Sequence, residues 1–511
     1  MKIVKKITAV LFVIFMLAGI IASCDSGSPE NIPVGGGDQN PGGEDSPQEG
    51  SGEPVNEKLL PDLPADADFN GYVFTVLAHK EESDDWITEV PREILAEVEN
   101  TDDPINDAVY KRNEMLKERY NIDFAVVANN YGEEHTVLSK AVKAGDDIYD
   151  AVIMFNNNVP TVVNGGLLTN VANLPYVDLG KPWWDPAVNS MSIDNKNYLL
   201  GGDMLILDNE ATNALVFNKE LMATLGMELP YNTVKEGKWT MDKMDEMIRG
   251  AAVDLNGDGK MTPEEDRWGF VCYRDTMHAL LVSGGGLLAD KNSDDIPYMV
   301  FAEPKNLTVL DKVMDIMYNK DDVLNIQSDI ADSGTASSNW LRAYHNAFEE
   351  NRSLFQWVRM RVVEKFRGME AEFGIIPLPK FDDNQSNYRS VVNPYTGVLL
   401  GVPKTAGDLE RTSVILEAIA AESRYTLQPA YYDVVLTRKF ARDAESEEML
   451  DIIFSSRVYD IGAVYAFGNS FIDLITLCNK SDRNISSYYE KRQGAMEKDI
   501  NKVITVFETM E

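Results

Sequence analysis

Residues 213–225 read NALVFNKELMATL, and this stretch decides the fold because a strand passes into a helix with no loop between them. Residues 213–218 carry β-branched and aromatic side chains, which favours a strand. Residues 219–225 follow at once as a helix. Strands that alternate with helices are typical of α/β domains, so we take this unit as the pattern to look for elsewhere.

The same alternation extends on both sides of this stretch. Upstream, we predict strands at 72–78, 123–128, 149–155 and 197–207, with helices at 104–120 and 137–144. Downstream, we predict helices at 307–318, 340–349 and 409–421, strands at 354–360, 372–378 and 397–402, and a largely helical chain from residue 429. The sequence therefore predicts parallel βαβ units.

Length and charge limit the architecture and the partners. The chain of 511 residues is too long for one core and suits two lobes. Its net charge of −36 argues against nucleic acid, whose phosphates it would repel. Besides Cys24, only Cys272 and Cys478 are present, which is no disulfide framework; the two either pair or remain free thiols.

The N-terminus has the pattern of a lipoprotein signal. Basic residues precede an apolar stretch at 7–20 that is short for a membrane span. The sequence Ile21-Ala22-Ser23-Cys24 then resembles the bacterial lipoprotein box, in which the cysteine after the cleavage point is lipidated. An ordinary secretory signal or an uncleaved anchor are the alternatives. We expect a signal peptide at 1–23, lipidation of Cys24, and a disordered acidic tether over 24–66.

Residues 254–265, DLNGDGKMTPEE, fit a twelve-residue calcium loop. Ca²⁺ prefers six to eight oxygen ligands on a flexible loop. The predicted ligands are Asp254, Asn256, Asp258, Lys260 through its backbone carbonyl, Thr262 and Glu265. A helix capped by Thr240 precedes the loop and a strand over 267–273 follows it, so we expect structural Ca²⁺. The alternative is a polar turn without metal.

Several stretches, in their order and spacing, resemble the extracellular solute-binding proteins of ABC importers, in the branch related to maltose-binding protein. The stretches are Tyr149–Val152, Asn164–Leu168, Leu215–Leu221, Lys238–Asp242, Phe373–Pro379 and Gly401–Lys404. The resemblance spans roughly residues 67 to 460, and the sequence beyond it matches no pattern of that family. Calcium loops occur in the second lobe of such proteins as structural elements.

The resemblance implies a type II periplasmic-binding-protein-like fold, with two α/β lobes joined by hinge strands around a ligand. It places lobe one at 67–210 and 377–425, lobe two at 211–376, and C-terminal helices at 426–511 across both lobes. The implied ligand is a small solute, most commonly a sugar. The implied partners are ABC permease subunits at the cell membrane, and we expect a monomer held there by its lipid anchor.

Sugar binders stack rings on aromatic side chains and hydrogen-bond the hydroxyl groups, so loop aromatics are the first candidates. The predicted ligand-binding residues are Trp183, Trp184, Asp203, Trp340 and Tyr395. We expect that Trp183 and Trp184, adjacent in a Pro-bounded loop, are not both buried. Packing within one lobe is the alternative for each aromatic residue, and a turn role is the alternative for Asp203. Trp357, in an apolar strand, is predicted to belong to the core.

Two other functions remain open from the sequence. A secreted carbohydrate-active hydrolase would need a catalytic pair that 83 acidic residues do not exclude, although no HExxH or GxSxG motif is present. A partner that presents ligand to a membrane sensor would share the fold. The order of the elements favours a binding protein that is not an enzyme.

Overall fold

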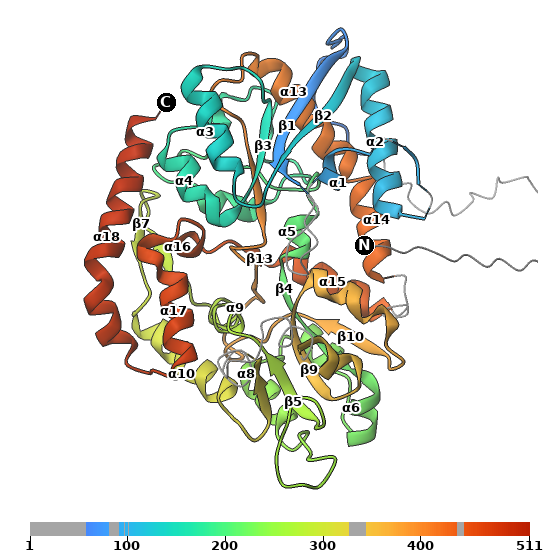
Figure 1. Cartoon of the computed structure of the whole chain (residues 1–511), viewed down its shortest axis with the longest axis vertical. Coiled ribbons are helices and arrows are strands. Elements are labelled where there is room, and N and C mark those ends of the chain that lie inside the picture. The colour runs from blue at the N-terminus through green and yellow to red at the C-terminus, as the bar shows by residue number, and fades with distance from the viewer. Residues whose placement is uncertain are drawn as a thin grey trace, which may run out of the picture. The chain divides into compact units, whose positions relative to one another are not determined.

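The computed structural model describes residues 58–80, 91–96, 98–100, 102–326, 344–436 and 444–510, and the body that they form begins at Leu59 (Figure 1). Cys24, the signal peptide and the tether as far as residue 57 lie outside the described residues, as does Trp340. None of the described helices combines the length and the apolar character that crossing a membrane requires.

The first sheet is the centre of lobe one. Its strand order is β12 (Val398–Gly401), β3 (Ala151–Phe155), β1 (Tyr72–His79) and β2 (Ile122–Asn129). β1 runs parallel to β2 and β3, whereas β12 returns antiparallel to β3. The helices of this lobe are α1 (Pro91–Ile94), α2 (Pro104–Tyr120), α3 (Glu134–Ala144), α4 (Val159–Asn164), α13 (Leu409–Ser423) and α14 (Leu427–Leu436).

The second sheet is the centre of lobe two, and Figure 1 shows it below the first. Its strand order is β10 (Phe373–Ile376), β4 (Asn213–Asn218), β9 (Ser353–Arg359), β5 (Trp268–Cys272) and β8 (Val323–Asn325). β5 runs parallel to β8 and β9, and β4 is antiparallel to β9 and β10. Its helices include α6 (Lys219–Leu225), α7 (Tyr231–Lys235), α8 (Met241–Ile248), α9 (Thr276–Ser283) and α10 (Pro304–Met317).

The direct passage from β4 into α6 has a local cause. All six residues of β4 are buried, and the last of them, Asn218, has extended backbone angles. Its side chain accepts a hydrogen bond from the Leu221 backbone N–H (2.9 Å), which satisfies one of the free donors at the start of α6. One residue therefore ends the strand and caps the helix.

Short segments lie where the chain passes between the two sheets. β11 (Ser390–Val391) pairs in parallel with β13 (Arg457–Val458), and α5 (Leu207–Glu210) immediately precedes β4. Arg457 of β13 forms ion pairs with Asp185 (3.1 Å) and with Asp208 of α5 (3.1 Å). Figure 1 shows α5 and β13 between the two sheets.

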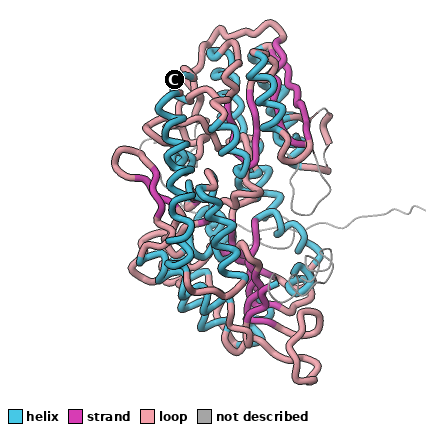
Figure 2. The backbone as a smooth tube through the Cα atoms, turned by 60° about the vertical axis from the view of Figure 1, so that its left-hand side comes forward, coloured by secondary structure: helices cyan, strands magenta, loops and turns pink. Residues whose placement is uncertain are grey.

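The C-terminal part is helical: α15 (Ala444–Ser455), α16 (Ile461–Val464), α17 (Ser470–Asn479) and α18 (Ile485–Thr509). The Tyr489 ring of α18 stacks on Phe301, just before α10 (centroids 6.0 Å apart). Near the other end of α18, Phe507 packs edge-on against Tyr198 of lobe one (5.1 Å). α18 therefore contacts both lobes, and Figure 2 shows it running down one side of the body from the C-terminus.

Most predicted elements are confirmed, but the strand predicted over 197–207 is wrong. This segment forms only isolated bridges, Trp184 with Gly202 and Leu200 with Leu400, before α5 begins. Gly202 explains the difference, because a Cβ there would lie 2.2 Å from the Trp183 carbonyl oxygen. The backbone approaches the preceding loop too closely for a regular strand.

Two further features refine the sequence analysis. Residues 59–66, predicted as the end of the tether, belong to the body: Leu63 packs against the core of lobe one, and Arg119 donates to the carbonyl oxygen of Ala65 (2.8 Å). Cys272 and Cys478 are both buried, and no disulfide bond joins them.

We predict that Phe507→Ala destabilises the protein because it leaves a void beneath the C-terminal end of α18. Phe507 is fully buried, and a truncation of this kind costs about 3–5 kcal/mol in free energy of unfolding. Denaturant titration measures the loss. Glu508→Ala, at the exposed neighbour, is the control and should change stability by less than about 0.5 kcal/mol. Equal stability of the two variants would show that α18 is not packed as described.

Candidate functional site

A cavity of about 390 Å³ lies between the two sheets, and its wall combines residues of both lobes with residues of α17. Tyr131 and Asn157 each lie two residues beyond the end of a lobe-one strand, β2 and β3 respectively. Residues 273–275 directly follow β5, and Arg359 is the last residue of β9. The carboxyl ends of parallel strands in both sheets therefore open onto one cavity, which is where α/β sheets bind ligands.

Aromatic side chains form much of this wall. The Tyr131 hydroxyl, from lobe one, donates to the Tyr395 carbonyl oxygen (3.0 Å). The Tyr395 ring packs on Phe471 of α17 (centroids 5.4 Å apart, 37° between planes). Tyr273, Tyr344 and Trp357 add aromatic side chains from lobe two. Such rings offer flat apolar faces next to polar edges.

Several buried polar atoms on the wall have no hydrogen bond among the described residues, and Trp357 Nε1 and Thr396 Oγ1 are two that are left without a partner. Trp357 itself is only 3% exposed, as expected of a core residue. A buried indole N–H without an acceptor costs free energy, typically 1–3 kcal/mol. Since these atoms belong to residues that line the cavity, a ligand with hydroxyl groups can satisfy them.

The charged groups of the wall come from lobe two. The Asn393 side-chain amide donates to Asp275 Oδ2 (3.0 Å), and Arg274 Nε lies 3.5 Å from Asp275 Oδ1. The Arg274 guanidinium also lies over the Tyr273 ring (5.2 Å). Arg359 completes the set. The wall thus offers planar polar groups of both charges, the guanidinium groups of the arginines and the carboxylate of Asp275.

Burial alters the ionisation of the wall. It raises the pKa of Tyr131 and of Tyr273 to about 12, and the Asp275 carboxylate contributes to the rise at Tyr273. Both hydroxyls therefore remain protonated donors at neutral pH. Burial lowers the pKa of Arg359, and Asp275 acts in the opposite direction, so the guanidinium stays charged.

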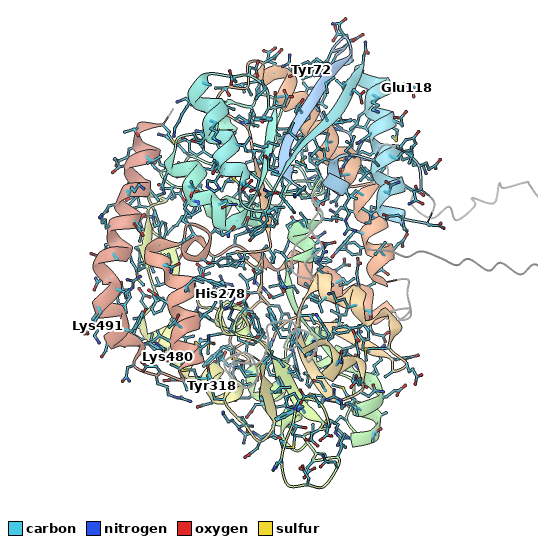
Figure 3. All side chains as sticks on the ribbon, in the orientation of Figure 1. Tyr72, Glu118, His278, Tyr318, Lys480 and Lys491 are labelled. Atoms are coloured by element: carbon cyan, nitrogen blue, oxygen red, sulfur yellow. The ribbon has the colours of Figure 1, made fainter. Side chains whose placement is uncertain are left out.

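A buried polar pair supports the α17 side of the cavity. His278 of α9, labelled in Figure 3, lies with Nε2 2.9 Å from Asp460 Oδ2. Its ring meets Phe471 edge-on (5.1 Å). Asp460 also accepts the backbone N–H groups of Leu288 and Gly462 (2.8 and 2.9 Å). The wall residue Phe471 is thus packed against a fully hydrogen-bonded group.

Of the predicted ligand-binding residues, only Tyr395 lies in this wall; Trp340 is outside the described residues. The expectation that Trp183 and Trp184 are not both buried is wrong, because both lie in the lobe-one core. Their indole N–H groups donate to Glu417 Oε1 (2.9 Å) and Oε2 (2.7 Å), respectively. Neither tryptophan lines the cavity.

Asp203 does not line the cavity either. Its carboxylate pairs with Arg424 of lobe one (3.0 Å). Burial raises its pKa to about 6, against the opposing effect of Arg424. The structure therefore gives Asp203 an ion-pair partner within its own lobe rather than a place beside Tyr395.

The sequence analysis missed Tyr131, Asn157, Asp275 and Arg359. A usable signal was present, since each of them lies at or just after the carboxyl end of a strand. Trp357 is buried in the core of lobe two, as predicted, and it also lines the cavity, which the sequence did not show because an apolar strand does not reveal which face of a sheet meets a cavity.

The predicted calcium loop is a closed, exposed connection between α8 and β5. Val253 and Arg267 pair at its base, and buried Asp266 accepts the backbone N–H groups of Leu255 (2.9 Å) and Thr262 (2.6 Å). The described residues contain no cluster of three or more His, Cys, Asp or Glu side chains arranged to hold a metal.

Hydrogen bonds within the loop fix its turns. Asp254 accepts the backbone N–H groups of Gly257 and Gly259 (both 2.7 Å). The side-chain amide of Asn256, at position 3, meets the carboxylate of Glu265, at position 12 (2.9 Å). Positions 3 and 12 of the loop therefore lie close together.

Comparison with known proteins gives a consistent result. The sequence profile of a family described as bacterial extracellular solute-binding protein matches residues 111–421. A search of curated protein sequences found no match.

Solved structures with the same fold include proteins from three different bacteria. The cyclic alpha-maltosyl-1,6-maltose binding protein of Arthrobacter globiformis has a TM-score of 0.54 at 14% identity, over 85% of this chain and 99% of that one. The maltose/maltodextrin-binding domain MalE of Bdellovibrio bacteriovorus, bound to maltotriose, has 0.52 at 13%, over 84% and 100%. M. tuberculosis UspC has 0.55 at 14%, over 84% and 100%. These similarities confirm the predicted two-lobe type II fold.

We predict that Glu417→Ala lowers the free energy of unfolding by about 3 kcal/mol, because it leaves two buried indole N–H groups without an acceptor. Glu417→Gln retains one carbonyl oxygen and should cost less. Denaturant titration distinguishes the two variants. Glu410→Ala, at an exposed position of the same helix, is the control. A loss no greater than that of the control would mean that Glu417 does not hold the two tryptophans.

Proposed function

Because the chain belongs to the family of bacterial extracellular solute-binding proteins, we propose that it captures a sugar in the cavity between its lobes for delivery to an ABC importer. The carrying observation is the cavity wall itself, where aromatic rings lie beside partnerless buried donors such as Trp357 Nε1. Rings and hydroxyl groups are the two features of a sugar that such a wall complements. The MalE domain of Bdellovibrio bacteriovorus, which has the same fold, is bound to maltotriose, and this agrees with a sugar as cargo.

Delivery to a permease also requires a position at the membrane. We propose that Cys24 carries the lipid and that residues 25–57 let the body reach permease subunits outside the cytoplasm. The lipoprotein box and the polar composition after it support this proposal. No catalytic role is assigned, since the family is one of binding proteins.

The first test is a thermal-shift and calorimetric panel of mono- and oligosaccharides on the purified protein. A sugar at one hundred times its dissociation constant should add about 2.7 kcal/mol to the free energy of unfolding. Tyr395→Ala should weaken binding at least about tenfold, because it removes a ring from the wall. Tyr298→Ala removes an exposed ring that does not line the cavity, and should bind normally. No response to any sugar would overturn the proposed cargo.

We further propose that residues 254–265 bind Ca²⁺ as a structural ion, with Asp254, Asn256, Asp258, Lys260, Thr262 and Glu265 as ligands. The spacing and the oxygen donors at positions 1, 3 and 12 support the proposal. The ion would fix the connection between α8 and β5, remote from the sugar.

We predict that Ca²⁺ raises the unfolding temperature and that a chelator reverses the rise. Glu265→Gln should abolish most of the effect because it removes the predicted bidentate carboxylate. Glu264→Gln is the matched control: its neighbouring side chain is equally exposed and is not a predicted ligand. Unfolding temperatures that do not depend on Ca²⁺ would favour the metal-free turn.

A further inference from the structure

Arg359 differs from the arginines around it. Its guanidinium is part of the cavity wall, yet no described residue forms a hydrogen bond or ion pair with it. Two residues further along, Arg361 pairs with Glu210 (3.3 Å). Before β9, Arg352 binds Glu350 (2.8 Å). A partly buried cation without a partner is costly, which makes its place in a ligand cavity informative.

The nearest acidic group of the wall does not neutralise Arg359. Asp275 influences it electrostatically, but both Asp275 oxygens face other groups: Oδ2 accepts from Asn393, and Oδ1 lies 3.5 Å from Arg274 Nε. Among the described lining residues, the two arginines thus outnumber the single carboxylate. This excess of positive charge lies in a chain whose net charge is −36.

We propose that Arg359 binds a carboxylate on the ligand, and that the cargo is an acidic sugar containing a uronic acid. This inference rests on the proposed function and narrows it. A guanidinium presents a flat pair of N–H donors that matches a planar carboxylate through two parallel hydrogen bonds. The aromatic residues then cover the ring, and Trp357 Nε1 and Thr396 Oγ1 meet hydroxyl groups.

The charge of the whole protein strengthens the argument. A strongly acidic protein repels anionic solutes at long range, so a site that binds one needs a local cation that is not already paired. A neutral sugar makes no such demand. The cavity volume of about 390 Å³ lies near the lower end of the roughly 300–1,000 Å³ common for ligand sites, which suits a monosaccharide or a short oligosaccharide.

Calorimetry with matched pairs of sugars tests the proposal on the purified full chain. Galacturonate and galactose, or glucuronate and glucose, differ at C6, where a carboxylate replaces a hydroxymethyl group. In the pair that binds better, the uronate should bind at least about tenfold more tightly than its neutral counterpart, as a hydrogen bond to a charged group implies. Added salt should weaken binding of the acid more than that of the neutral sugar.

Variants then assign the preference to one side chain. Arg359→Gln should bring the affinity for the acid within about threefold of that for its neutral counterpart. Arg359→Lys keeps the charge but not the planar pair of N–H donors. Its preference for the acid should therefore lie between that of the unmodified protein and that of Arg359→Gln. Arg249→Gln, at an exposed arginine that does not line the cavity, should bind as the unmodified protein does. Thermal unfolding checks that each variant is folded.

Each outcome decides a different point. Equal or tighter binding of the neutral sugar by the unmodified protein overturns the acidic-sugar inference and leaves the proposed function standing. Tighter binding of a sulfated sugar than of a uronate overturns the carboxylate assignment. If no sugar binds, acidic or neutral, the proposed function itself fails. Should Arg359→Gln not fold, the matched pairs on the unmodified protein still decide the question.

Discussion

The ion pairs of Arg457 hold together the part of the molecule on which the arrangement of the two sheets depends. Arg457 belongs to β13, Asp185 caps the 3-10 helix η3 (Pro186–Met191), and Asp208 belongs to α5, just before β4 enters lobe two. All three side chains are nearly excluded from solvent. Removing one partner from such a buried group typically costs 3–5 kcal/mol, because the remaining charge is left uncompensated. The network therefore fixes where the chain crosses between lobes.

The position of the cavity depends on where the chain passes between the two lobes. β1, β2 and β3 run parallel in one sheet, and β5 and β9 run parallel in the other, so each sheet has one edge of carboxyl ends. The crossing directs these edges towards the same space. Tyr131 and Asn157 arrive from one side, and Asp275 and Arg359 from the other. No single element forms a complete site, which explains why no compact motif marks it in the sequence.

Elements that are determined by residues close together in the sequence were predicted well. The NALVFNKEL stretch became β4 and α6 because burial of the strand and the Asn218 cap are both encoded within a few residues. The strand predicted over 197–207 is wrong because the backbone at Gly202 lies too close to the Trp183 carbonyl for a regular strand. Trp183 is distant enough in sequence that a local pattern does not reveal this contact. The burial of Trp183 and Trp184 could not be predicted locally because their acceptor, Glu417, is 233 or more residues away in sequence. Tyr395 lies in the cavity wall, in a loop that returns to lobe one.

The contacts of α18 determine which side of the body is free to widen. At 25 residues and about 1.5 Å per residue, α18 is a rod of about 37 Å with nearly constant length. Tyr489 attaches one end of it beside lobe two, and Phe507 attaches the other to lobe one. A rod fixed at both ends keeps the lobes at one separation along its own flank. Any change in the angle between the lobes therefore displaces the opposite flank most, in the way that a book opens away from its spine.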